Sequence, residues 1–209
     1  MPVITISRMF GAGGSEVAAR VAGELGWALL DNALIERVAV GLHMTPANVQ
    51  AIEERAPSLA ERLADALAFS SQEMLAAPLG VALPPTEQRI LEVTHRVIDE
   101  AVARGPAVLV GRGAQAWLAA RNDALHVYCV SSPAACAERV AARESISLAD
   151  AARLVDDMNR QRTEYVKRNW GRDWGAAANY DLCVNTAWLG IQGASRLVTD
   201  VARRTLQSA

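Results

Sequence analysis

The chain has few of the features that mark membrane, secreted and nucleic-acid-binding proteins. Among its 209 residues Lys167 is the only lysine, and the net charge is −2. A charge so close to zero offers little electrostatic attraction for DNA, RNA or an anionic membrane surface. The chain holds no apolar run near the roughly 18 residues of a membrane span and no basic-then-apolar signal. We therefore expect no nucleic-acid partner, no membrane association and no export.

Cysteine is also scarce, with thiols only at Cys129, Cys136 and Cys183. An odd number of thiols, two of them in strand-like apolar runs, suits packed and reduced cysteines better than a disulfide framework or a zinc site. The histidines show no spacing that indicates a metal site. The sequence predicts a protein of the reducing cytoplasm that acts on small molecules.

What the chain does contain is a regular alternation of strand-like and helix-like segments. Hydrophobic residues make up 51% of it, enough to bury the core of a single domain over 1–209. Apolar runs without alternation are typical of strands buried on both faces of a parallel sheet. Such runs occur at 107–110, 125–130 and 182–184; further strands are expected at 3–7 and 27–30, and helices at 15–25 and 31–41. The sequence therefore predicts an α/β fold with about five parallel strands between two helical layers.

Two helix-like stretches interrupt this alternation. Residues 45–104 carry helix start signals and a proline-glycine break but no strand, which predicts a helical insert over one side of the sheet. Residues 147–167 are dense in arginine and run into glycines and Trp174 before the last strand. This second stretch predicts a mobile lid over about 147–178.

The first predicted strand leads into a glycine-rich loop, in the stretch SRMFGAGGSEVA at 7–18. Glycines let backbone N–H groups turn toward a phosphate, and the following helix N-terminus adds partial positive charge. The predicted phosphate-binding residues are Gly11, Ala12, Gly13, Gly14 and Ser15. Ser15 also stands where a hydroxyl would bind Mg²⁺. The alternative is a plain glycine turn with Ser15 as the helix N-cap.

Two positions depart from the usual phosphate-binding loop. Position 14, normally lysine, is glycine, and position 8, normally glycine, is Arg8. An arginine fork just before the loop can reach over the phosphates and replace the missing lysine. In the alternative, Arg8 is a surface side chain at a strand end. Glu16 suits the helix dipole but would repel a phosphate without magnesium, so its role stays open.

A second group of candidates lies at the ends of other strands. Arg112 follows the strand predicted at 107–110, and Asp31 follows the one at 27–30. Ligands of open parallel sheets bind at the carboxyl ends of the strands, so both side chains can contact a phosphate acceptor. The alternatives are an ordinary glycine turn around Arg112 and a helix N-cap at Asp31.

A third group lies in the arginine-rich stretch. Arg153, Asp157 and Arg160 are spaced by four and three residues, which places them on one helix face, and Arg162 follows. Cations beside a cleft can neutralise a transferring phosphoryl group, and Asp157 can orient an arginine or a sugar hydroxyl. The alternative is a solvated helix with ordinary Asp–Arg pairs.

Together these segments resemble the cytidylate kinase-like proteins, a lysine-less branch of the nucleoside monophosphate kinases. The opening ITISRMFGAGG at 4–14 matches the branch's ITISRxxGSGG form. Further matches are LLDNALI at 29–35, ERAPS at 54–58, VGRGA at 110–114 and YDLCVNT at 180–186. The resemblance covers nearly the whole chain, and it implies a three-layer P-loop kinase fold that uses ATP and Mg²⁺.

The resemblance also implies roles for individual residues. Arg112 would contact the acceptor nucleotide, and Arg153, Asp157 and Arg160 match an RxxxDxxR lid motif whose arginines bind phosphates and whose aspartate binds ribose. The spacing to the following Gly and Trp fits Arg162 better than Arg160. Both arginines are therefore kept as catalytic candidates.

Two departures from the family pattern concern the choice of substrate. Standard cytidylate kinases have aspartates on both sides of the Gly-Arg pair, where this chain has Val110 and Gly113. The expected reaction is ATP-dependent phosphoryl transfer to a nucleoside monophosphate, CMP or dCMP first, with Arg8 as a further catalytic residue. The alternatives are a nucleotide-binding regulatory protein without turnover and a kinase for a non-nucleotide small molecule. Small-molecule nucleotides are the expected partners, and a homodimer is left open.

Overall fold

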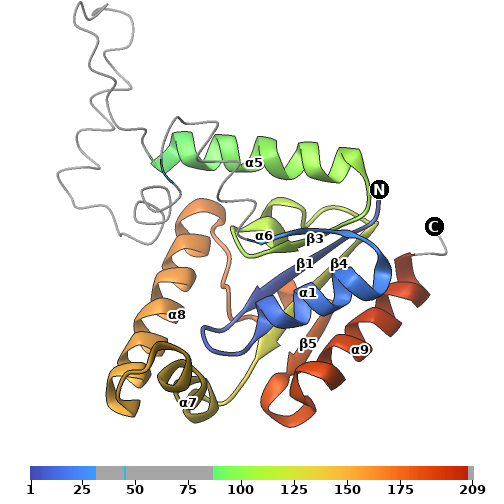
Figure 1. Cartoon of the computed structure of the whole chain (residues 1–209). Helices are drawn as coiled ribbons and strands as arrows, with labels where there is room; N and C mark the ends of the chain where they lie inside the picture. The colour runs from blue at the N-terminus through green and yellow to red at the C-terminus, as the bar shows by residue number, and fades with distance from the viewer. Residues whose placement is uncertain (32–44, 46–86, 207–209) are drawn as a thin grey trace, which may run out of the picture.

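The computed structural model describes residues 1–31, 45 and 87–206, and its centre is a five-stranded sheet (Figure 1). The strands are β1 (Val3–Arg8), β2 (Ala28–Leu30), β3 (Ala107–Val110), β4 (Ala124–Val130) and β5 (Leu182–Asn185). Their spatial order is β2-β3-β1-β4-β5, and all neighbouring pairs are parallel. Each of the five predicted strands is present, which confirms the parallel α/β fold.

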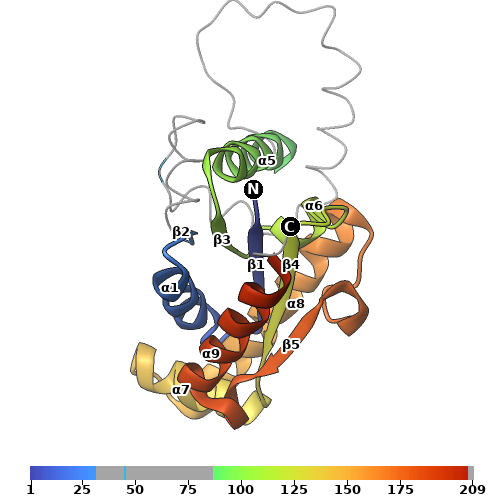
Figure 2. The same ribbon diagram turned by 90° about the vertical axis from the view of Figure 1, so that its right-hand side faces the viewer.

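Helices cover both faces of this sheet. The α-helices among the described residues are α1 (Gly14–Leu25), α5 (Glu87–Arg104), α6 (Ala114–Trp117), α7 (Pro133–Glu144), α8 (Leu148–Trp170) and α9 (Thr186–Leu206). Helices α1 and α9 pack on one face and α5 and α6 on the other, as the end-on view in Figure 2 shows. The result is a three-layer sandwich.

The central strand β1 is covered by helices on both of its faces. Ile4 and Ile6 of β1 belong to the core cluster shared with α1 and α9, whereas Val3 belongs to the cluster shared with α5. All three side chains are fully buried. Successive side chains of a strand point to opposite faces, and in β1 both sets are buried, including the polar Thr5 and Ser7.

The last part of the predicted helical insert is a helix that packs on one face of the sheet. Residues 87–104 form α5, and its Ile90, Val93 and Ile98 are buried in the core that includes Leu109 of β3. The rest of the predicted insert, apart from Thr45, lies outside the described residues, as does the helix predicted at 31–41. In the described part of the chain, no helix is long and apolar enough to cross a membrane.

The arginine-rich segment predicted as a lid contains one long helix, α8. The hydroxyl of Ser147 accepts a hydrogen bond from Asp150 N at 3.1 Å and caps its start, and Gly171, with φ of 65°, ends it. Ala151 and Val155 of α8 are buried against α7. This packing fixes one helix face, and motion of the segment as a lid stays a prediction.

The sheet has a point from which chain connections diverge. The connection from β1 runs to β2 on one side, while the connection from the neighbouring β4 runs to β5 on the other. In open α/β sheets, ligands bind in the crevice outside the carboxyl ends of the strands at such a point. The glycine loop that follows β1 ends on that edge.

Candidate active site

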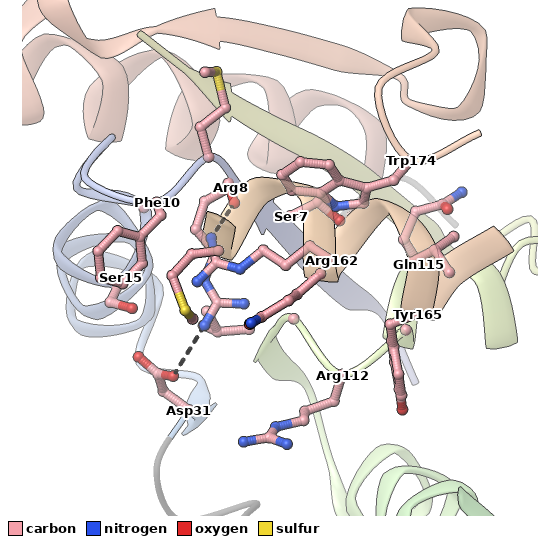
Figure 3. A pocket seen from close by; sticks show the side chains of 18 of the residues that line it. Ser7, Arg8, Phe10, Ser15, Asp31, Arg112, Gln115, Arg162, Tyr165 and Trp174 are labelled. Carbon is pink, nitrogen blue, oxygen red and sulfur yellow. Dashed lines mark hydrogen bonds and ion pairs between the residues drawn. The ribbon is translucent and has the colours of Figure 1, made fainter. Parts of the chain in front are cut away.

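A cavity of about 320 Å³ opens at the carboxyl ends of β1 and β3 (Figure 3). It is lined by the glycine loop, the turn after β3 and one face of α8. Its charged lining residues are Arg8, Arg112, Arg143, Arg162, Glu16 and Asp31. Among the described residues, four arginines line the cavity against two carboxylates, an excess of positive charge that suits an anionic ligand.

The glycine loop presents backbone donors beside this cavity. Gly11 and Gly13 have φ of 83° and 71°, left-handed conformations that favour glycine. Within the described residues, the N–H groups of Gly13, Gly14 and Ser15 have no hydrogen-bond acceptor. Free N–H groups at a helix N-terminus form a binding site for an anion such as phosphate. The prediction of a phosphate-binding loop therefore agrees with the local geometry.

The alternative of Ser15 as a helix N-cap is wrong. The cap residue of α1 is Gly13, so Ser15 is the second residue of the helix. Ser15 lines the cavity, where its hydroxyl can contact a ligand or a metal ion. Ala12, in contrast, is buried against α7 and does not line the cavity. Its backbone N–H donates to the carbonyl oxygen of Met9 at 3.2 Å, and its carbonyl oxygen accepts a hydrogen bond from the Thr186 hydroxyl at 2.8 Å, so Ala12 does not present a donor to the cavity.

Arg8 is the last residue of β1, and its side chain extends into the cavity with 23% exposure. Its stem lies against Gly14 and its guanidinium against Gly111, so it passes between the two glycines. Arg8 Nη2 lies 3.9 Å from Asp31 Oδ1. Burial lowers the pKa of Arg8, and the carboxylate of Asp31 opposes this shift. The interpretation of Arg8 as a surface side chain is therefore wrong.

The turn after β3 aims Arg112 at the same cavity. Gly111, Arg112 and Gly113 all adopt left-handed φ, at 71°, 56° and 67°. A non-glycine residue in this region is uncommon and marks local backbone strain, which clusters at functional sites. Burial lowers the pKa of Arg112 to about 10, while the neighbouring Tyr165 has its pKa raised to about 12, also by burial.

Helix α8 is joined to the glycine loop by two hydrogen bonds. Arg162 Nη1 donates to the carbonyl oxygen of Arg8 at 2.7 Å, and Phe10 N donates to Asn159 Oδ1 at 2.8 Å (Figure 3 marks the first). The guanidinium carbons of Arg143 and Arg162 lie 5.2 and 5.4 Å from the centroid of the Phe10 ring. These are cation–π distances, so one ring supports two of the cavity's cations.

The structure does not bring the RxxxDxxR residues to the cavity. Arg153 is 75% exposed and paired with Asp150, and Arg160 is 66% exposed and paired with Asp157. None of these residues lines the cavity. Here the alternative of a solvated helix face with Asp–Arg pairs describes the structure. Of the two catalytic candidates in α8, Arg162 faces the cavity and Arg160 does not.

Sequence reasoning did not find several lining residues. Arg143 lies in the last turn of α7 and Phe10 precedes the glycines, and neither had a pattern that pointed to the site. The residues of α8 that line the cavity are Met158, Gln161, Arg162, Tyr165 and Val166. Their spacings of three and four residues define one helix face, a signal that was present but masked by the more conspicuous arginines on the other face.

Trp174, which follows α8 in the chain, also lines the cavity. It is 8% exposed, and its ring meets Tyr128 edge to face at a centroid distance of 5.2 Å. Trp174 thus adds apolar surface to a cavity whose other walls carry charged groups.

The fold is that of the P-loop kinases. Similar solved structures include a gluconokinase from Sinorhizobium meliloti 1021, with a TM-score of 0.54 and 16% identity over 100% of this chain and 97% of that chain. A shikimate kinase from Bacteroides thetaiotaomicron has a TM-score of 0.52 and 13% identity over 96% and 97%. An uncharacterized protein from Eubacterium ventriosum ATCC 27560 has a TM-score of 0.70 and 18% identity over 97% and 98%. Identities this low show a shared fold alone.

The amino-acid sequence, unlike the fold, identifies the family to which the chain belongs. The model described as the cytidylate kinase-like family matches residues 3–187, and the chain belongs to this family. No match was found among curated proteins. Family and fold together support phosphoryl transfer in general.

Proposed function

We propose that the protein transfers the γ-phosphoryl group of ATP to a nucleoside monophosphate, with CMP or dCMP as the first candidates. One observation carries this proposal: a cavity joins a strand-end arginine to a glycine loop whose N–H groups have no acceptor among the described residues, and further arginines line the same cavity. Two negatively charged phosphate groups can approach each other only where cations neutralise their charge. In this proposal one half of the cavity would bind the donor phosphates and the other half would bind the acceptor phosphate.

The donor half is the glycine loop. Its N–H groups at positions 13 to 15 would bind the donor phosphates. Ser15 and Asp31 offer a hydroxyl and a carboxylate oxygen for Mg²⁺, which usually takes its other ligands from phosphates and water. The described residues contain no group of three histidine, cysteine or acidic side chains that could hold a metal alone. When bound, Mg²⁺ would neutralise charge on the donor phosphates.

The acceptor half is the turn after β3 with its aromatic surroundings. Arg112 would bind the phosphate of the acceptor, and Tyr165 and Trp174 provide apolar surface beside it. An ionised phosphate needs no general base, because its oxygen can attack directly. The bond from that oxygen to the γ-phosphorus forms as the bond to the β,γ-bridging oxygen breaks, which gives two diphosphates.

The charges of the lining favour such an acceptor over an alcohol. An alcohol requires removal of a proton, and a carboxylate is the usual base. In the described part of the lining the carboxylates are Asp31, which faces Arg8, and Glu16, which is paired with Arg139. Arg8 and Arg162 would instead neutralise charge on the transferring group, since phosphoryl transfer depends on positioning and electrostatics.

The test uses the purified full chain with ATP and Mg²⁺ against a panel of nucleoside monophosphates and small sugar and cyclic alcohols, with ADP release as the measure. We expect turnover with CMP or dCMP well above the rate without acceptor, and loss of that turnover in Arg112→Ala. Turnover only with an alcohol would favour the non-nucleotide kinase. ATP binding without turnover on any acceptor would support the regulatory alternative and overturn both enzymatic ones.

A further inference from the structure

Positions 8 and 14, six residues apart in the chain, touch each other across the start of the loop. An ideal Cβ placed on Gly14 would lie 2.5 Å from Arg8 Cβ and 2.9 Å from Arg8 Cγ. Real Cβ atoms do not approach other carbons so closely. The backbone of Gly14 is not in the left-handed region, unlike that of Gly13. The contact with Arg8 is therefore what prevents a side chain at position 14.

We infer that positions 8 and 14 form an exchange pair, in which the loop admits a side chain at only one of the two. The usual loop has glycine at the first and lysine at the second, and this chain has the reverse arrangement. Because the nearest atom is the Cβ of Arg8, any residue other than glycine at position 8 excludes a side chain at 14. The missing lysine is thus a steric consequence of the arginine.

Gly111 completes this arrangement on the far side of the cavity. A Cβ at Gly111 would collide with Arg8 Nη1, so the glycine of the turn after β3 leaves room for the guanidinium. The cation is held between the donor loop and Arg112, near Asp31. The exchange thus supplies the site's missing positive charge from β1 instead of α1. This functional half of the inference rests on the proposed function.

The steric half is tested by thermal unfolding, which needs no activity. We expect Gly14→Ala to lower the Tm by roughly 3 to 10 °C, the cost of an overpacked contact in a domain of this size. The same change should cost nearly as much in an Arg8→Ala background, because the Cβ remains. In an Arg8→Gly background the cost should disappear. If Gly14→Ala fails to fold, recovery of the folded chain in the Arg8→Gly/Gly14→Ala variant gives the same result.

Gly13→Ala is the matched control. Its cost comes from the left-handed backbone at φ of 71° and from a collision of the new Cβ with Ile191, and neither involves Arg8, so it should be equal in all three backgrounds. An equal cost of Gly14→Ala in the Arg8→Gly and native backgrounds would overturn the exchange pair. So would the absence of any cost in the native background.

The functional half is tested by titration with ATP and Mg²⁺, followed by calorimetry. Arg8→Gly should weaken binding on the order of 10-fold to 100-fold, the loss of one charged hydrogen-bond donor. Arg8→Gly/Gly14→Lys should recover at least about tenfold of it. Arg8→Gly/Gly14→Ala, with the same space and no charge, is the control, and equal affinity of these two double variants would overturn the charge replacement. A native chain that binds no ATP would contradict the proposed function, while the unfolding series still decides the exchange pair.

Discussion

Helix α8 carries arginines on its cavity side and on its outer side, and the two differ in exposure and in hydrogen-bond partners. Arg162, on the cavity side, donates to a loop carbonyl and lies near the Phe10 ring. Arg153 and Arg160, on the outer side, are 75% and 66% exposed, and each pairs with a carboxylate three residues before it. An exposed pair of this kind contributes little to stability, and its opposite charges largely cancel for a ligand in the cavity.

The comparison teaches that helix phase decides which arginine is part of the site. The outer residues recur at spacings of four and three residues, and so do the cavity-facing ones, but the two sets point in different directions. A spacing pattern identifies residues that share a face. It does not identify which face the rest of the fold covers.

The largest effect of a substitution should appear at Arg8 of β1, a cavity cation that is 23% exposed, in contrast to the exposed arginines of α8. Arg8→Ala is expected to lower kcat/KM on the order of 10³-fold, comparable to the loss of an arginine that stabilises a phosphoryl-transfer transition state. Steady-state kinetics with ATP and CMP measures it, with circular dichroism to verify folding. An unchanged rate would remove Arg8 from the catalytic machinery.

The direct comparison within α8 comes next in size. Arg162→Ala should lower kcat on the order of 10²-fold, because it removes both a cavity charge and the contact with the loop. Arg160→Ala, the matched change on the outer face, should stay within about twofold of the native rate, since an exposed ion pair contributes little. The reverse order of effects would mean that the helix rotates its outer face toward the substrate during turnover.

A smaller effect is expected at Phe10, which supports cations without being one. Phe10→Leu should lower kcat on the order of 3-fold to 30-fold with less change in KM, because a cation–π contact contributes about 0.5 to 2 kcal/mol. Phe10→Tyr keeps the ring and should retain most of the rate. Equal losses in the two variants would show that the ring does not position the arginines.

The smallest expected effect is a pH dependence at Arg112. Its pKa of about 10 means that the free protein loses this charge as the pH rises through 10, whereas an ordinary arginine stays charged to its usual 12.5. We expect kcat/KM for the acceptor to fall a few-fold between pH 8 and 10.5, and the profile of Arg112→Met to be flatter over this range. Because burial lowers the pKa of Arg112 in the folded state, its deprotonation above pH 10 does not lower the free energy of unfolding. Parallel profiles in both variants would assign the fall to another group.

Much of the fold could be predicted from the sequence because its cues are local. The five strands follow from short, mostly apolar segments, and the start of α8 follows from a capping serine. The position of residues 87–104 could not be predicted in the same way. An amphipathic helix has the same sequence pattern whether it packs on the sheet or lies within a separate insert.

The site was predictable in part for the same reason. The glycines at 11, 13 and 14 and the strand-end Arg112 are recognisable from sequence order alone, and the structure places them at one cavity. The contact between Arg8 and Gly14 could not be predicted, because it depends on how the loop closes on itself. Arg143 belongs to a different helix, so only the tertiary packing brings it to the ring of Phe10.

The contact between Arg8 and Gly14 also restricts the order in which such a loop can change. A chain that replaces glycine and lysine by arginine and glycine, one residue at a time, cannot begin at position 8, because the stem of the lysine fills the space. It must first lose the lysine and pass through glycine at both positions. That intermediate has no cation in the loop, so we expect it to bind the donor phosphates more weakly than either of the two forms that it connects. The two loops are therefore alternative states that single substitutions seldom interconvert.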